Sequence, residues 1–126
     1  MVIDSASSVQ DGYYPDNVAK AKQKVIESDS NELASFFKMF ACETRIKILL
    51  ALSETELCVS DLAHVLDMSA DAISHQLRSL REARFVKTRK YGNLVFYSLE
   101  RQHVEPIIHQ TIEHLKEEEE PLEEKD

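Results

Sequence analysis

The stretch from Glu56 to Leu99 constrains the fold most, because two short helical patterns are followed at once by two strand-like segments. The first helical pattern runs from Cys58 to Leu66, with Ser60 as its expected N-cap. After a break of two residues, Ser69 is the expected N-cap of a second helix. The apolar stripe of this second helix recurs at i, i+4 and i+7 and consists of Ile73, Leu77 and Leu80. The pattern predicts a helix-turn-helix.

The residues after the second helix predict a β-hairpin. Phe85 to Lys90 and Leu94 to Leu99 are rich in β-branched and aromatic residues, and Gly92 lies between them in a segment that tolerates positive φ. The expected fold class is therefore mainly α with a small β-hairpin, a winged helix-turn-helix. In that arrangement one helix enters the major groove of duplex DNA, and the hairpin beside it can hold phosphates or enter the neighbouring minor groove.

Polar residues on the second helix and on the hairpin are candidates for contact with DNA. A solvated helix face alone would explain the polarity of the helix, and it is the neighbouring hairpin that favours DNA binding. The helix residues outside the apolar stripe are Ser69, Asp71, Ser74, His75, Arg78 and Arg81, and the basic residues of the hairpin are Lys87, Arg89 and Lys90.

The net charge of −8 argues at first against a polyanionic partner, but its distribution answers the objection. Residues 1–33 carry −3 and residues 113–126 carry −6, whereas residues 34–112 carry +1. Ser69 to Glu100 holds six basic residues against three acidic ones. We expect the acidic ends to limit non-specific binding to DNA, and the binding of a specific site to depend strongly on salt.

The length of 126 residues and the 43% of hydrophobic residues predict one domain. The expected division is a disordered arm over 1–14, a winged domain with dimerisation helices over 15–119, and an acidic tail over 120–126. No apolar run is long enough for a membrane span and no secretory signal is recognisable, so a cytoplasmic location is expected. No nucleophile-base arrangement, phosphate loop or HExxH pattern indicates an enzyme.

Further helices are expected on both sides of the helix-turn-helix. Pro15 begins one helix, Asn31 caps the next, and Thr44 to Leu52 is apolar enough to lie in the core, with Arg45 pointing outward. His103 to Glu119 reads as a closing helix with more apolar surface than one core needs. The surplus predicts a helical dimerisation interface.

The runs FACETRIKILLAL, ELCVSDLA and SHQLRSLREARFVKTRKYGNLVFYSL together resemble the ArsR/SmtB family of metal-responsive repressors, over about residues 32–117. The resemblance implies a homodimer that binds a palindromic operator and is released by an inducer. It makes Ser69 to Arg78 the recognition helix. Within that helix Ser74, His75 and Gln76 occupy the family's SHQL positions, and Arg89 and Lys90 lie in the wing.

The same resemblance implies a metal site on the last helix, with His103 of one protomer beside His114 and Glu117 of the other. The two histidines lie eleven residues apart, about 16 Å along one helix, so one ion cannot join them within one chain. Nitrogen and oxygen ligands suit zinc. Arg101 stands where the family has an aspartate, so water or Glu105 would have to complete the shell, or Arg101 would pair with the partner's Glu117 in place of a metal. Histidines at a polar dimer edge are the structural alternative.

A second site implied by the resemblance uses Cys58 and Asp61 with ligands from the partner's N-terminal arm, which here contains no Cys or His before Asn31. Thiolates favour soft metals. A buried Cys58 with a purely structural role is the alternative. Cys42, near a helix N-terminus, is a candidate redox or soft-metal partner of Cys58.

These observations predict a homodimeric winged-helix repressor that is released from a palindromic operator by a divalent metal ion, with zinc the first candidate. One alternative is the same dimer responding to a thiol oxidant or a soft metal through its cysteines. The other is a winged-helix adaptor that binds protein through its acidic ends.

Overall fold

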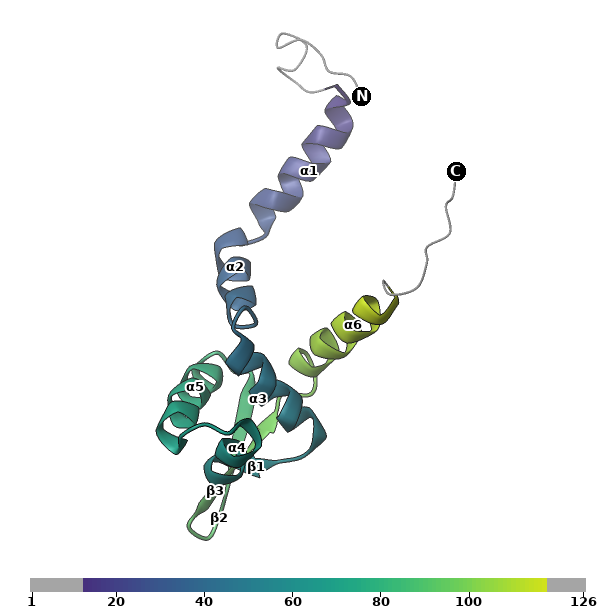
Figure 1. Ribbon diagram of the computed structural model, residues 1–126. Helices are drawn as coiled ribbons and strands as arrows, with labels where there is room; N and C mark the ends of the chain where they lie inside the picture. Colours follow the sequence, from purple (N-terminus) through teal and green to yellow (C-terminus); the bar gives the residue numbers. More distant parts are fainter. Residues whose placement is uncertain (1–12, 118–126) are drawn as a thin grey trace. The chain divides into compact units, whose positions relative to one another are not determined.

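The structure is a computed structural model that describes residues 13–117. Contacts divide the chain after Phe37, so the residues up to Phe37 and those from Lys38 onward are described separately. The expected arm lies outside the described residues except for Tyr13 and Tyr14, and the expected acidic tail lies wholly outside them. The elements are α1 (Pro15–Glu27), α2 (Ser30–Lys38), α3 (Glu43–Glu54), β1 (Leu57–Cys58), α4 (Val59–Leu66), α5 (Ala70–Glu82), β2 (Val86–Tyr91), β3 (Leu94–Leu99) and α6 (Val104–Glu117) (Figure 1).

The first unit contains α1 and most of α2, close to where the sequence predicts them. Proline at the first position of α1 is favourable, because that N–H would have no helical partner. The N-cap of α2 differs from the expectation: the Asp29 side chain, not Asn31, accepts the Glu32 N–H at 3.0 Å. Neither helix has a buried side chain. Their exposed large apolar residues are Val25, Ile26, Leu33 and Phe37.

The second unit has one apolar core, to which α3 contributes as expected. Ile48, Leu49 and Leu52 of α3 are fully buried, whereas Leu50 is 40% exposed. The remaining fully buried side chains come from α4, α5, the start of the hairpin and its end, and they are Leu62, Ile73, Leu77, Leu80, Phe85 and Leu99. Within residues 13–117 no helix is long and apolar enough to cross a membrane.

The hairpin expected from the sequence is present, but it belongs to a three-stranded antiparallel sheet in the order β1-β3-β2. In β1, Cys58 pairs with Phe96, while Val86 of β2 pairs with Leu99. Gly92 takes a φ of +63° in the turn between β2 and β3, a conformation that costs glycine little. The sequence does not predict the short strand β1, because two residues are too few to show the alternation of apolar and polar side chains that is typical of a strand.

This third strand also corrects the expected start of the first helix of the helix-turn-helix. Pairing with Phe96 keeps Cys58 extended, so α4 begins directly at Val59 and Ser60 is not its N-cap. The helix ends at Asp67, which adopts the left-handed conformation with a φ of 58°. From there the chain turns into α5, where Ser69 is the N-cap as predicted and accepts the Ala72 N–H at 3.1 Å.

Ser69→Ala is expected to lower the free energy of unfolding by about 1 kcal/mol, because the substitution removes the side-chain acceptor at the N-terminus of α5. Ser60→Ala is the matched control. Ser60 is exposed and caps no helix, so its substitution should stay within about 0.5 kcal/mol of wild type. Urea unfolding followed by circular dichroism measures both, and equal losses from the two variants would contradict the assignment of the cap.

Candidate nucleic-acid interface and sensor sites

Helix α5 presents a polar face because its apolar stripe is completely buried. Ile73, Leu77 and Leu80 have no exposed surface. Of the candidate DNA contacts on or next to this helix, those that are exposed are Ser69, Asp71, His75, Arg78 and Arg81, and those that are half-buried are Ser74 and Gln76. The stripe therefore fixes the rotation of the helix, and the side chains expected to meet DNA face outward or lie at the edge of the buried stripe.

Gln76 is already in contact with another part of the chain. Its side-chain oxygen accepts a hydrogen bond from the Arg45 guanidinium at 3.3 Å. Arg45 also donates to the main-chain oxygens of Met39 at 2.9 Å and Lys38 at 3.2 Å. The expectation that Arg45 simply points outward is thus wrong, because carbonyl groups left at the end of α2 attract its guanidinium. Within the second unit, Arg45 links Lys38 and Met39 to α5.

The wing contains an ion pair that the sequence did not indicate. Arg89 donates to the two carboxylate oxygens of Glu56, from Nε at 3.2 Å and from Nη2 at 2.9 Å. Its guanidinium carbon also lies 5.1 Å from the centroid of the Phe96 ring. The hydrogen bonds from Arg89 lower the pKa of the Glu56 carboxyl below its ordinary value. Arg89 is therefore not simply extended toward solvent, whereas Lys90 is exposed and has no ion pair within the described residues.

Three other basic residues of this region lie together at the base of the hairpin. Arg81, Arg84 and Lys87 line a shallow hollow together with Val86, Thr88 and Glu100. Lys87 pairs with Ser98 near the base of the hairpin, whereas the turn at Gly92 lies at its other end. Arg84 adopts a φ of 65° at the link between α5 and β2. The positive charge predicted for the whole stretch is thus divided between the base of the hairpin and its outer part.

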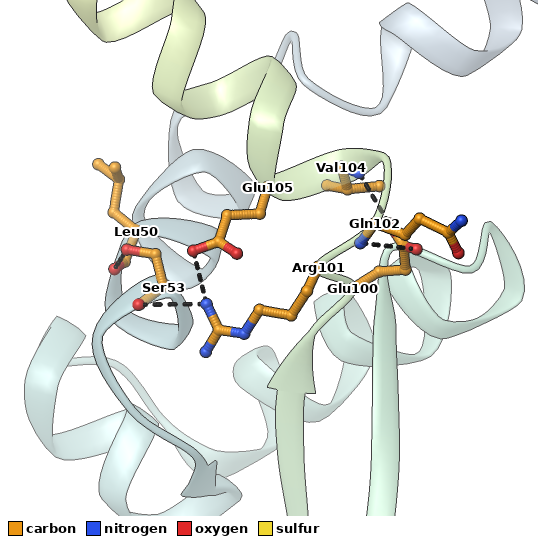
Figure 2. Close-up of polar contacts among 7 residues, drawn as sticks. All are labelled: Leu50, Ser53, Glu100, Arg101, Gln102, Val104 and Glu105. Atoms are coloured by element: carbon orange, nitrogen blue, oxygen red, sulfur yellow. Dashed lines mark hydrogen bonds and ion pairs between the residues drawn. The ribbon is translucent and has the colours of Figure 1, made fainter.

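Glu100 organises the start of α6, next to the first candidate metal ligand. Its carboxylate accepts hydrogen bonds from the main-chain N–H groups of Gln102, His103 and Val104 at 3.2, 2.8 and 2.7 Å. The same carboxylate lies 3.5 Å from Nδ1 of His103. Figure 2 shows the cap from Glu100 beside the contacts of Arg101. The carboxylate holds the backbone around His103 in place.

Arg101 pairs within its own chain. Its Nη1 lies 2.6 Å from Oε2 of Glu105 and donates to the main-chain oxygen of Ser53 at 3.4 Å (Figure 2). Arg101 and Glu105, which appear in the two alternatives for completing the site, are thus bound to each other in this structure. The contact with Ser53 also attaches the start of α6 to the end of α3.

The three candidate ligands of the last helix are exposed. His103 lies immediately before α6, and His114 and Glu117 lie in its last turn. Within residues 13–117 no group of three or more His, Cys, Asp or Glu residues is gathered closely enough to hold a metal ion. Ligands separated by three helical turns can meet around one ion only if a second chain supplies some of them.

The cysteine candidates have different surroundings. Cys58 is 9% exposed and forms part of the core, whereas Asp61 on α4 is exposed. Cys42 is half-buried at the N-cap position of α3, and both cysteines are thiols rather than a disulfide. The burial of Cys58 matches the structural alternative for this residue and leaves its sulfur little access to a partner's arm.

The cap from Glu100 predicts an acid-sensitive contribution to stability. The hydrogen bonds from the main chain, that of Val104 foremost, lower the pKa of the Glu100 carboxyl below its ordinary value of 4.5. A carboxyl with a lowered folded-state pKa stabilises the fold above the unfolded-state pKa, and this contribution is lost as the pH falls through the folded-state value. Glu100→Gln is expected to cost about 0.5–2 kcal/mol at neutral pH.

Urea unfolding at a series of pH values measures this effect. The difference between wild type and Glu100→Gln should shrink as the pH drops below 4.5. Glu82→Gln, at an exposed position of α5, is the control with the same change of charge. A difference that stays constant down to the acid limit would contradict the role of the ionised carboxylate.

Comparison with known proteins assigns the chain to a family. The sequence model described as "Bacterial regulatory protein, arsR family" matches residues 42–88. The chain is 39% identical over 103 residues to the "Transcriptional repressor SmtB homolog" of Synechocystis sp., covering 81% of this chain and 78% of that protein. It is 37% identical over 105 residues to the "Cadmium resistance transcriptional regulatory protein CadC homolog" of Staphylococcus aureus, covering 82% and 87%.

Solved structures give the same result for the fold. The antimony-specific transcriptional repressor AntR superposes with a TM-score of 0.63 at 30% identity, covering 72% of this chain and 83% of that one. HlyU from Vibrio cholerae superposes with a TM-score of 0.62 at 35% identity, covering 68% and 92%. The predicted winged helix-turn-helix is thereby confirmed, and the family is one of regulators rather than enzymes. The chain belongs to the ArsR/SmtB family of DNA-binding transcriptional repressors.

Proposed function

We propose that the protein is a homodimeric repressor whose two α5 helices read a palindromic operator and which a divalent metal ion releases from DNA, with zinc the first candidate. The observation that carries the proposal is the surface of α6, where Ile112 and Leu115 are 36% and 54% exposed beside the candidate ligands. Exposed apolar side chains on a helix favour a partner helix. The named specificities of CadC and AntR support a metal as inducer.

The donors along α6 fit a zinc site between two chains. His103 and the partner's His114 and Glu117 would supply two imidazoles and a carboxylate, which are ligands that zinc takes. Glu100 lies 3.5 Å from Nδ1 of His103 and would orient the ring, leaving Nε2 for the ion. Arg101, which is paired with Glu105, stands where the family pattern has an aspartate, so the site has one ligand fewer and water would complete it.

The proposed domain assignment keeps the bounds expected from the sequence. Residues 15–119 form the winged domain with its dimerisation helices, and the flanking segments 1–14 and 120–126 contribute acidic charge. DNA contacts are assigned to Ser69, Asp71, Ser74, His75, Gln76 and Arg78 of the reading helix and to Arg89 and Lys90 of the wing.

Release of the operator would occur by a shift in the populations of two conformations of the dimer. An ion that joins the α6 helices favours one spacing of the two protomers, and if that spacing fits the operator poorly, binding of the metal weakens binding of DNA. The coupling is reciprocal, so operator DNA must weaken zinc binding by the same factor.

A second candidate inducer is a thiol oxidant or a soft metal acting through Cys42 with Cys58 or through Cys58 with Asp61. The partial exposure of Cys42 at the start of α3 is the observation in its favour. The burial of Cys58 weighs against it, because a sulfur in the core has little access to an oxidant or to a metal ion. A Cys58→Ser protein that keeps the full response to its inducer would exclude this route.

The deciding experiment titrates reduced, metal-free protein with zinc while the anisotropy of a labelled palindromic duplex from its own upstream region is recorded. Wild type should bind zinc and release the duplex, and His103→Ala should remain bound to DNA. His109→Ala is the matched control, because His109 is exposed on the same helix and is not a proposed ligand. Sedimentation of the free protein measures its oligomeric state, which we expect to be a dimer.

Four results would contradict the proposal. Wild type that binds no zinc, or that binds zinc and keeps the duplex, would remove zinc from the mechanism. A His103→Ala protein released like wild type would move the metal elsewhere. Equal affinity for the palindrome and for a duplex with one scrambled half-site would oppose a symmetric dimer and favour the adaptor alternative.

A further inference from the structure

A single row of side chains connects the wing to the start of the helix-turn-helix. Arg89 on β2 lies opposite Phe96 on β3, and Phe96 in turn lies opposite Cys58 on β1. Opposite residues in antiparallel strands share a face of the sheet. The Arg89 guanidinium extends over the Phe96 ring at 5.1 Å and reaches Glu56 just before β1. Since β1 leads directly into α4, this contact ties the outer strand of the wing to the reading unit.

The geometry of the pair leaves part of the guanidinium available. Arginine has five N–H donors in a planar fork, and here one from Nε and one from Nη2 are used by Glu56. The two on Nη1 and the second on Nη2 remain. The Arg89 side chain is 52% exposed, so half of its surface is open to solvent, where an anion could approach.

We propose that Glu56 is a positioning residue for DNA binding: it fixes the guanidinium of Arg89 across Phe96 so that the remaining donors meet a phosphate of the DNA backbone. The inference rests on the proposed placement of the wing against DNA. Two parallel hydrogen bonds orient a planar group far better than one, and orientation before binding reduces the entropy lost when the complex forms. Arg89 touches the phosphate, and Glu56 acts only through Arg89.

The proposal predicts an effect whose sign differs from that of simple electrostatics. Removing a carboxylate near DNA reduces repulsion between the protein and the phosphates. If Glu56 were merely near the DNA, the protein should therefore bind more tightly after the carboxylate is neutralised. If Glu56 positions Arg89, its neutralisation should instead weaken binding. Glu54→Gln provides the matched control, because Glu54 is an exposed carboxylate two residues away that is not hydrogen-bonded to Arg89.

The experiment measures binding of the full chain to its upstream duplex by anisotropy over a range of salt concentrations. We expect Glu56→Gln to lower the affinity about three- to tenfold, which corresponds to the net contribution of one ordinary hydrogen bond, because Arg89 loses its orientation but keeps its charge. The slope of log affinity against log salt should shrink by up to about 0.9, the value for one phosphate contact. Glu54→Gln should leave the slope unchanged and the affinity equal to or above that of wild type.

Two further variants separate positioning from folding. Arg89→Lys keeps the charge but loses the fork, so it should weaken binding, and adding Glu56→Gln to it should cause no additional loss. Thermal unfolding should be close to wild type for all variants, because an exposed ion pair contributes little to stability. The inference would be overturned if Glu56→Gln bound the duplex as tightly as wild type or more tightly, or if it caused the same loss with and without Arg89→Lys. Wild type that fails to bind the duplex would instead contradict the proposed function.

Discussion

Phe85→Ala is expected to lower the free energy of unfolding by about 3–5 kcal/mol. The Phe85 side chain has no exposed surface, and its ring centroid lies 4.9 Å from that of Phe40. Its main chain also joins two elements, since its N–H donates to Leu80 at 2.8 Å and its oxygen accepts from Glu100 at 2.9 Å. An alanine leaves those backbone bonds in place but opens a cavity between α5, the hairpin and the Phe40 segment.

Such a loss is a large part of the stability of a domain of this size, typically about 5–15 kcal/mol. Urea unfolding at one fixed protein concentration measures it, because dimer formation would make the midpoint depend on concentration. Tyr91→Ala is the control: Tyr91 is 69% exposed near the hairpin turn and should cost less than about 1 kcal/mol. A Phe85→Ala protein within about 1 kcal/mol of wild type would show that this ring is not central to the core.

The second large effect is expected at the reading helix, where Arg78→Ala should weaken binding of the upstream duplex by about 5–150-fold, or roughly 1–3 kcal/mol. Arg78 is exposed on the polar face of α5, which the burial of Ile73, Leu77 and Leu80 holds outward. The substitution removes a cation and a planar donor group without disturbing the core. Circular dichroism should therefore show an unchanged fold.

Two measurements show what Arg78 contacts. If it binds phosphate, the loss should be uniform across sequences and the salt slope should fall by about 1; if it binds a base edge, preference at one position should relax. Arg81→Ala is the matched control, because Arg81 lies on the same helix but lines the hollow at the base of the hairpin. Equal losses of affinity in the two variants would indicate that Arg78 acts through the overall positive potential of the protein rather than through a specific contact.

The reading helix and the wing are each connected to a distant part of the chain, and both connections are made by arginine. Arg45 joins Met39 to Gln76, and Arg89 joins the wing to Glu56. Each guanidinium uses several donors at once, which a lysine cannot reproduce. Two of the side chains expected to meet DNA, Gln76 and Arg89, are thus each hydrogen-bonded to a residue outside the expected contact surface, Arg45 and Glu56 respectively.

The sequence by itself determined the elements whose signals are local. Ser69 caps α5, the i, i+4, i+7 stripe is buried, and Gly92 lies in the hairpin turn, because caps, helical faces and tight turns depend on residues within a few positions of one another. The runs that resemble the ArsR/SmtB family led to the correct fold and family. The DNA contacts and the metal ligands remain predictions from the same source.

The tertiary structure alone decided the features that join distant segments. The strand β1, the start of α4 at Val59 and the pairing of Glu56 with Arg89 all follow from the sheet order β1-β3-β2, which places side chains 33 residues apart in contact. The pairing of Arg45 with Gln76 spans 31 residues in the same way. The periodicity of the sequence carries no information on such pairs. A charged residue is predicted from the sequence to be exposed to solvent, and only the tertiary structure shows which distant acceptor lies within hydrogen-bonding distance of it.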